Sequence, residues 1–199
     1  MTGREIFLAQ LEPHMLQTDL ENVCTAYIFS KYGHRPQVRD GGGRYFEHPK
    51  AVANIIIQEL GLRSDWRLPA TALLHDIPED SWILSEHRMR VNFGREVALW
   101  VKYLTKNPEE GYYERLTDVH TPWQVILVKL CDRLDNLRTL SGCRPEKQRR
   151  KISETQKYFP ALADALISRC PRKYKRHAKY LKEKIEEICN NYERDEVLS

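Results

Sequence analysis

Apolar residues recur at helical spacing in one segment of this chain after another, and this periodicity limits the fold to an assembly of helices. Residues of about 17–31 and about 49–60 both repeat an apolar side chain every three or four positions. Runs of β-branched residues in strict alternation with polar ones, which would indicate strands, are nearly absent. We therefore predict an all-α fold.

Proline and glycine residues mark the expected ends of the helices. Pro49 stands at the start of one helix, where its missing N–H is harmless, and Gly61 ends that helix. Three consecutive glycines, Gly41 to Gly43, interrupt any regular element before it. Further helices are expected over residues 67–76, 81–92, 94–105, 122–141, 145–168 and 172–195, and a polar loop over 107–122.

Length and composition indicate one globular domain spanning 1–199, with a core of about 20–168 and a charged C-terminal helix of about 172–195. The net charge of +4 suits an anionic small molecule and is too weak to indicate nucleic acid. The five cysteines are scattered without a Cys-x-x-Cys pair, which is typical of reduced thiols. The first residues read as neither a signal peptide nor a membrane anchor, so we expect a cytoplasmic protein without a membrane partner.

His75 and Asp76 follow an apolar run, Ala-Thr-Ala-Leu-Leu, at the end of a predicted buried helix. Burying an unpaired charge is costly, and a divalent cation held by imidazole and carboxylate is one way to offset that cost. A cap, a salt bridge or a core histidine is the commoner explanation of such a pair when it stands alone. His48, at the mouth of another helix, and Asp132, inside an apolar helical run, are also unusually polar for their places. One metal ion held by all four residues accounts for every case.

An acidic pair, Glu79 and Asp80, lies three and four residues after Asp76. Pro78 disfavours helix just before it, so a loop or a helix start is expected here. The pair either favours the dipole of a following helix or performs acid–base chemistry beside a metal-activated water.

Several side chains could contact a substrate. Asn136 stands four residues after Asp132 and so shares its helix face, where it could orient a ligand. Arginine suits phosphate through paired hydrogen bonds, although a solvated loop explains any single one. The candidate cationic residues are His34, Arg35, Arg39 and Arg44 in the glycine-rich loop, with Lys129 and Arg133 near Asp132.

The order of these motifs resembles a known family. The segments that carry the resemblance are YGHRPQVRDGGGRYFEHPKAVANII, TALLHDIPEDS, NFGREVALWVKYLTK, VKLCDRLDNLRTL and KISETQKYFPALADAL. Together they are similar to the HD hydrolase domain of Rel/SpoT proteins, over roughly residues 20–168. With no synthetase or regulatory region in the sequence, the chain resembles a stand-alone small alarmone hydrolase.

The resemblance implies a compact HD-domain bundle of about ten helices that hydrolyses the 3′-diphosphate of (p)ppGpp, giving GDP or GTP and pyrophosphate. It implies a single Mn²⁺ on His48, His75, Asp76 and Asp132, and a catalytic role for Glu79 and Asp80. It also implies that Arg39 packs against the nucleobase and that Asn136 lies near the ribose.

The chain departs from the family around the glycine-rich loop and the acid pair. Asp40 stands where a lysine is usual, and Gly41-Gly42-Gly43-Arg44 replaces the usual turn. Asp40 places negative charge near an expected phosphate, which Arg44 could offset. The adenine alarmone (p)ppApp and NADPH therefore stay open as substrates, as does a nucleotide-sensing module without turnover. A helical interaction domain is a further alternative, and the sequence leaves a homo-oligomer open.

Overall fold

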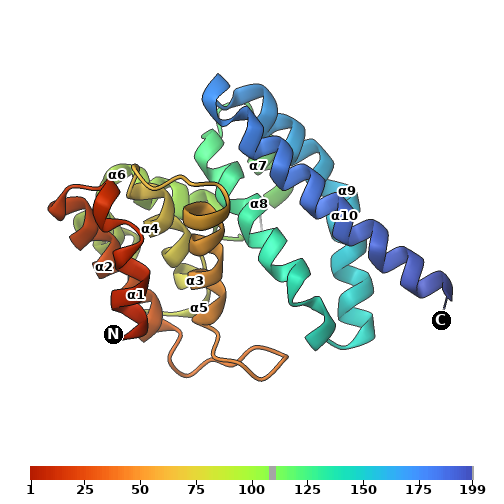
Figure 1. Cartoon of the computed structure of the whole chain (residues 1–199), viewed down its shortest axis with the longest axis horizontal. Coiled ribbons are helices and arrows are strands. Elements are labelled where there is room, and N and C mark those ends of the chain that lie inside the picture. The colour runs from red at the N-terminus through yellow and green to blue at the C-terminus, as the bar shows by residue number, and fades with distance from the viewer. Residues whose placement is uncertain (108–110, 199) are drawn as a thin grey trace. The chain divides into compact units, whose positions relative to one another are not determined.

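A computed structural model describes residues 1–107 and 111–198 (Figure 1). Over these residues the elements are helices, and an isolated antiparallel bridge joins Val38 to Arg44. The predicted all-α class is confirmed. The chain divides into two compact units, residues 1–110 and 111–199. The predicted single domain stays a prediction.

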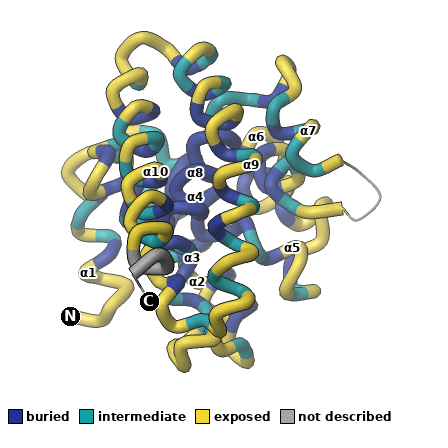
Figure 2. The backbone as a smooth tube through the Cα atoms, turned by 90° about the vertical axis from the view of Figure 1, so that its right-hand side faces the viewer, coloured by how far each residue is buried: buried dark blue, intermediate teal, exposed yellow. Residues whose placement is uncertain are grey.

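The first unit is arranged around one short apolar helix. Its α-helices are α1 (Gly3–Ala9), α2 (Gln17–Gly33), α3 (Glu47–Asn54), α4 (Arg67–Leu74), α5 (Ile77–Asp80) and α6 (Glu86–Leu104). Helix α4 contacts α2, α3 and α6, and every residue from Leu68 to Leu74 is buried (Figure 2). A helix covered on all sides needs apolar side chains all round, which this run supplies. The C-terminal end of α4 therefore delivers the next residues, His75 and Asp76, from a rigid core.

The predicted helix over 49–60 begins earlier than expected and changes its winding. Helix α3 starts at Glu47, so His48 lies in its first turn, and the segment Ile55–Glu59 continues as a π-helix. Gly61, with φ of 65°, follows it as predicted, because glycine adopts positive φ without steric cost.

The two helices predicted over 81–105 are partly wrong. Helix α6 starts only at Glu86, and the preceding Ser85 caps it by accepting a hydrogen bond of 3.3 Å from the Arg88 amide. This capping explains the later start, since a serine hydroxyl satisfies one of the free amides of the first turn. Gly94, with φ of 78°, breaks α6 where the sequence predicts a division.

The described part of the second unit combines the short helix α7 with longer helices that pack on one another. Its α-helices are α7 (Tyr112–Thr117), α8 (Trp123–Arg138), α9 (Pro145–Arg169) and α10 (Lys175–Leu198). Helix α8 contacts α9 and α10, which lie side by side in Figure 1. These helices confirm the three predicted over 122–141, 145–168 and 172–195, apart from short 3-10 turns at 140–142 and 172–174.

Helix α7 corrects the predicted loop over 107–122, of which residues 108–110 lie outside the described residues. Tertiary contacts explain the helix better than its polar sequence does. Leu116 is fully buried, and the ring of Tyr113 stacks on Tyr158 of α9 with centroids 4.0 Å apart.

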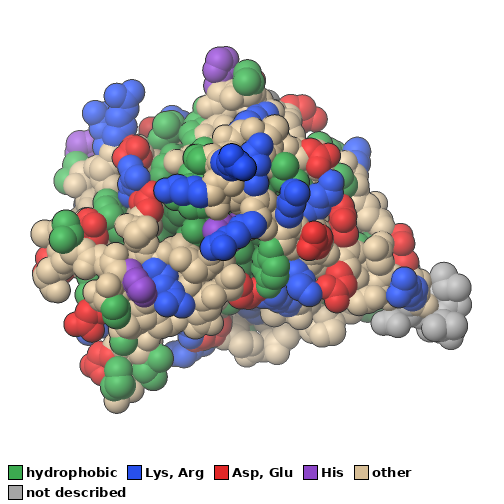
Figure 3. Space-filling view, turned by 45° about the horizontal axis from the view of Figure 1, so that its top comes forward, with side chains coloured by type: hydrophobic (Ala, Val, Ile, Leu, Met, Phe, Trp, Pro, Cys, Tyr) green, Lys and Arg blue, Asp and Glu red, His purple; other side chains and the backbone are tan. Residues whose placement is uncertain are grey.

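The surface carries both signs of charge. Acidic side chains lie among the basic ones on the face shown in Figure 3, in keeping with the modest net charge. Among the described helices, none combines the length and the apolar character that crossing a bilayer requires.

Candidate metal centre and its neighbours

His75 is held at the end of α4 in one defined orientation. Its Nδ1 lies 2.7 Å from the carbonyl oxygen of Ala72, one turn earlier in the same helix. A carbonyl can only accept, so Nδ1 carries the proton and Nε2 of the neutral ring keeps its lone pair. A hydrogen bond from the ring nitrogen that does not bind the metal is the usual means by which proteins orient a metal-binding imidazole. The structure therefore presents Nε2 of His75 as a ligand atom.

Asp76 and His48 face the same point. The Asp76 Oδ1 lies 3.1 Å from Nε2 of His75, and its Oδ2 lies 3.6 Å from Nε2 of His48. The ligand atoms of the two histidines lie within 4.8 Å of each other. Both rings are buried. Two imidazoles and a carboxylate converging in this way form a donor set suited to a divalent cation.

Tyr45 ties this group to the preceding loop. Its hydroxyl donates a hydrogen bond of 2.8 Å to Oδ2 of Asp76, and its ring packs against His34, with centroids 4.8 Å apart. The same hydroxyl lies close enough to Asp80 to lower the pKa of that carboxyl. Tyr45 thus connects two of the predicted site carboxylates, a role that the sequence analysis missed.

Glu79 and Asp80 are the last two residues of the short helix α5, where the sequence analysis expected either a loop or a helix start. The backbone amide of Lys106, just beyond α6, donates a hydrogen bond of 2.7 Å to Oε1 of Glu79. Oδ2 of Asp80 lies 3.8 Å from Nδ1 of His34. The backbone carbonyl of Asp80 accepts a hydrogen bond of 3.1 Å from the side-chain amide of Gln37. The two acids are therefore held by different elements and are not interchangeable.

The pKa of the Asp80 carboxyl is raised above its ordinary value. Burial is the main cause and the nearby Asp76 carboxylate adds to it, whereas His34, His75 and the Tyr45 hydroxyl oppose it. A carboxylate with a raised pKa is a better proton acceptor, as general bases require.

His34, a predicted substrate contact, is 1% exposed. Its Nδ1 lies 2.6 Å from Oε1 of Gln37, and burial lowers the pKa of its imidazole, which favours the neutral ring. A neutral His34 between Gln37 and Tyr45 supports the walls of the site. Its contact with substrate stays a prediction.

The loop that carries Arg39 and Arg44 is a tight turn. The Arg39 amide donates to the Gly43 carbonyl at 2.8 Å, and Gly42 adopts a φ of 88°. The Arg44 guanidinium is exposed and lies 3.0 Å from the Glu47 carboxylate. Both arginines remain predicted substrate contacts.

Helix α8 of the second unit carries the other predicted site residues. Asp132 and Asn136 share one face as predicted, with the Asn136 amide donating to Oδ1 of Asp132 at 2.6 Å. The Lys129 ammonium donates to Oδ2 of Asp132 at 2.7 Å, and both side chains are buried. Burial alone would lower the pKa of Lys129, but the Asp132 carboxylate raises it above its ordinary value, which favours the ammonium form.

Arg133, also in α8, is held by residues of other helices. Its guanidinium lies 3.1 Å from the Glu154 carboxylate and over the ring of Phe159, and it donates to the Tyr113 hydroxyl at 3.3 Å. Because these partners lie on other helices, no local sequence signal indicated them. The predicted contact of Arg133 with substrate stays a prediction, beside a clear role in holding α7, α8 and α9 together.

Comparison with known proteins supports the expected family. Residues 26–115 match the family described as HD domain. A probable guanosine-3′,5′-bis(diphosphate) 3′-pyrophosphohydrolase from Synechocystis sp. is 36% identical over 177 residues, which cover 82% of this chain and 22% of that protein. The bifunctional (p)ppGpp synthase/hydrolase SpoT of Escherichia coli K12 is 30% identical over 78% of this chain and 23% of its own length. The chain thus spans under a quarter of the length of these curated relatives.

A solved structure shows the same fold. It belongs to a protein described as a metazoan ortholog of SpoT that hydrolyses ppGpp and plays a role in starvation responses. The TM-score is 0.67 at 22% identity, over 86% of this chain and 95% of that one. The predicted resemblance to the HD hydrolase domain of Rel/SpoT proteins is confirmed.

Proposed function

We propose that this chain is an HD-type phosphohydrolase that removes the 3′-diphosphate of (p)ppGpp, giving GDP or GTP and pyrophosphate. The observation that carries the proposal is the convergence of His48, His75 and Asp76 beside the acid pair of the next short helix, α5. The names of the similar proteins from Synechocystis and Escherichia coli support the choice of substrate. The proposal includes a small-molecule substrate and a cytoplasmic location.

The proposed metal set is His48, His75, Asp76 and Asp132, loaded with Mn²⁺. Nε2 of His75 is held in a fixed orientation, and the two carboxylate oxygens of Asp76 lie next to Nε2 of His75 and Nε2 of His48. This arrangement fits a divalent ion. When bound, such an ion lowers the pKa of a water molecule and offsets negative charge on the phosphoryl group. Asp132 would join through the carboxylate that Lys129 and Asn136 hold in place on α8.

Asp80 and Glu79 would each carry out one of the two proton transfers. Asp80, with its raised pKa, accepts a proton from the attacking water, whose oxygen bonds to the phosphorus attached to the 3′ oxygen. The bond between that phosphorus and the 3′ oxygen breaks, and the 3′ oxygen receives a proton. Glu79 would relay this proton, since the Lys106 amide fixes one of its oxygens.

The remaining predicted residues would position the substrate. The Lys129 charge lies next to Asp132, where it would offset charge on the transferred phosphates. Asn136 would lie near the ribose and Arg39 against the base. Arg44, Arg133 and His34 would contribute through the loop and helix that they stabilise.

Another purine nucleotide is the second candidate function. The exposed Asp40 in the glycine-rich turn stands beside the predicted base-binding Arg39, so (p)ppApp or NADPH could replace the guanosine alarmones. The metal set serves these substrates equally well, because it acts only on the phosphoryl group.

The test is a substrate panel on manganese-loaded protein. Purified protein is incubated with ppGpp, pppGpp, ppApp and NADPH, and products are separated by ion-exchange chromatography, with an EDTA-treated sample in parallel. An Asp80→Asn protein, whose metal content is measured separately, controls for a contaminating hydrolase.

We expect EDTA-sensitive pyrophosphate from the guanosine alarmones and none from the Asp80→Asn protein. Release of pyrophosphate from ppApp alone would mean that the protein catalyses the proposed reaction but prefers adenine to guanine. Phosphate from NADPH alone would replace the alarmone by another substrate. No turnover of any compound by metal-loaded protein would favour a sensing module.

A further inference from the structure

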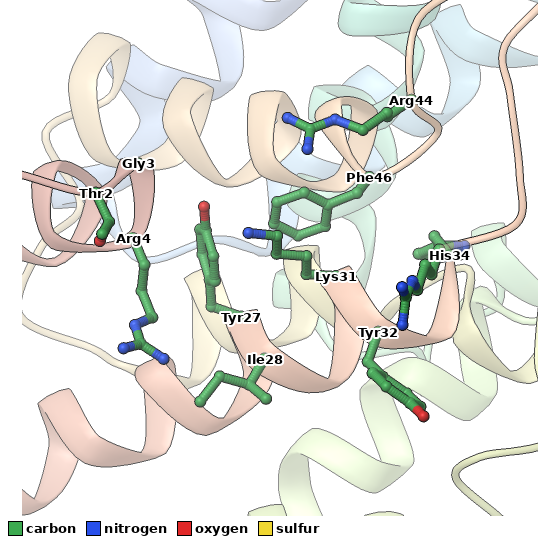
Figure 4. A pocket seen from close by; sticks show the side chains of 11 residues that line it. Thr2, Gly3, Arg4, Tyr27, Ile28, Lys31, Tyr32, His34, Arg44 and Phe46 are labelled. Carbon is green, nitrogen blue, oxygen red and sulfur yellow. The ribbon is translucent and has the colours of Figure 1, made fainter.

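A second candidate ligand site lies on the first unit. A cavity of about 650 Å³ opens between the start of α1, the outer face of α2 and the loop before α3 (Figure 4). Its volume falls within the range of about 300–1,000 Å³ typical of small-molecule sites. His48, His75 and Asp76 are not among its lining residues.

The lining of this cavity is basic. Arg4, Lys31, Arg35 and Arg44 line it, and no aspartate or glutamate stands among the lining residues. Glu47 lies close by, but Lys50 and Arg44 already share its carboxylate. At least three of the four cations thus face the cavity without an acidic lining residue to neutralise them.

Aromatic rings complete the walls. Tyr27 and Phe46 are buried and meet edge to face, with ring centroids 4.9 Å apart, which gives the cavity a rigid side. A Cβ added at Gly3 would lie 3.8 Å from the Tyr27 hydroxyl, so the start of α1 closes over this ring. Tyr32, 64% exposed, also lines the cavity, near the C-terminal end of α2.

We propose that this cavity binds a polyphosphate group, carried by free polyphosphate or by a nucleotide. Several cations around one concave space bind several phosphate oxygens at once, and arginine does so with paired hydrogen bonds. The Tyr27 hydroxyl adds a neutral donor at the edge. An exposed ring in the lining offers a base a stacking surface, so a nucleotide gains a contact that free polyphosphate lacks.

His34 connects the two sites of this unit. It lines the cavity, and its Nδ1 lies 3.8 Å from Oδ2 of Asp80. A ligand in the cavity would therefore lie one side chain away from the predicted catalytic pair. The binding proposal itself stands whether or not the chain hydrolyses alarmones.

The test is isothermal titration calorimetry on the full chain, stripped of metal with EDTA and then dialysed. Inorganic tripolyphosphate and GTP are titrated separately at low ionic strength. The Arg4→Gln/Lys31→Gln protein removes two cavity cations. The matched Arg90→Gln/Arg95→Gln protein removes two exposed cations of α6 and carries the same net charge. A His75→Asn protein reports on ligand bound at the metal centre, and circular dichroism checks the fold of each variant.

We expect single-site binding of both ligands that weakens about tenfold or more in Arg4→Gln/Lys31→Gln and changes little in the other two proteins. Tighter binding of GTP than of tripolyphosphate would identify a nucleotide as the ligand, and equal binding would identify the phosphate chain alone. Absence of binding, equal weakening in both double variants, or loss of binding only in His75→Asn would overturn the proposal.

Discussion

The Tyr45 hydroxyl donates a hydrogen bond of 2.8 Å to the Asp76 carboxylate, which lies 31 residues further along the chain. This contact joins the loop before α3 to the end of α4 at the candidate metal centre. The same Asp76 oxygen lies 3.6 Å from Nε2 of His48. Tyr45 therefore helps to orient a candidate metal ligand from outside the metal site.

Replacing Tyr45 by phenylalanine removes this bond while keeping the ring that packs on His34. We expect the affinity for Mn²⁺ to fall by about tenfold, since partners of metal ligands typically contribute about 10- to 100-fold. Titration of metal-free protein with Mn²⁺ measures this change. Tyr32→Phe, on the exposed face of α2, is the matched control. Unchanged affinity in Tyr45→Phe would show that Asp76 needs no such support.

The acid pair gives the second prediction. Asp80→Asn should lower kcat by about 10²- to 10⁴-fold, the usual contribution of a general base, and leave the Mn²⁺ content unchanged. Glu79→Gln should lower kcat less, because a glutamine oxygen can still accept from the Lys106 amide. Glu12→Gln, at an exposed carboxylate, is the control. A larger loss in Glu79→Gln than in Asp80→Asn would reverse the proposed roles.

Much of the site could be predicted because its polar residues break an apolar pattern. His75 and Asp76 end a fully buried helix, and Asp132 interrupts the apolar run of α8, so each needed a chemical reason that the sequence alone suggests. Tyr45 gave no such signal, because an aromatic residue before a helix usually belongs to the core. Its hydroxyl becomes informative only when the fold brings Asp76 within hydrogen-bonding distance.

The errors in the fold have a similar origin. Helix α7 has a polar sequence and is stabilised by Tyr113 stacking on Tyr158, a contact between residues 45 positions apart that no local pattern encodes. The late start of α6 depends on which of two nearby serines caps it, and local propensity hardly distinguishes Ser81 from Ser85. Ser85 carries the cap, whereas Ser81 ends α5.

The proposed metal set extends to α8, and Asp132→Asn tests this third prediction. We expect Mn²⁺ binding to be lost, because a neutral amide is a much weaker ligand than a carboxylate. Metal content after gel filtration measures the effect. Asp164→Asn, on the surface of α9, is the control. Since the buried Lys129 would lose its partner, the fold is checked by circular dichroism. Full Mn²⁺ content in a folded Asp132→Asn protein would remove Asp132 from the set.

Metal removal provides the fourth prediction. A ligand that binds only the folded chain at about 100 times its Kd stabilises it by about 2.7 kcal/mol. For a chain of this size we expect Mn²⁺ to raise the Tm by about 5–10 °C. Differential scanning calorimetry with and without EDTA measures this shift. His75→Asn should show no shift, and a shift that persists in this variant would place the metal elsewhere.

The fifth prediction concerns the ion pair between Arg133 and Glu154 in the second unit. Burial disfavours the charged form of Glu154, but the Arg133 guanidinium and the Tyr113 hydroxyl outweigh it and lower the pKa of the carboxyl from 4.5 to about 2. A carboxyl whose pKa is lowered on folding stabilises the fold above its unfolded pKa. That stability is lost as the pH falls from 4.5 towards 2.

Glu154→Gln should therefore reduce the free energy of unfolding at pH 7 by about 2–3 kcal/mol, because the buried Arg133 loses its counter-charge. The difference between this variant and the original chain should shrink as the pH falls below 4.5, since protonated Glu154 is as neutral as glutamine. Urea unfolding at pH 7, 5 and 3 measures this difference, with Glu183→Gln on the exposed side of α10 as control. A difference that is independent of pH would mean that shape, and not charge, carries the contribution of Glu154.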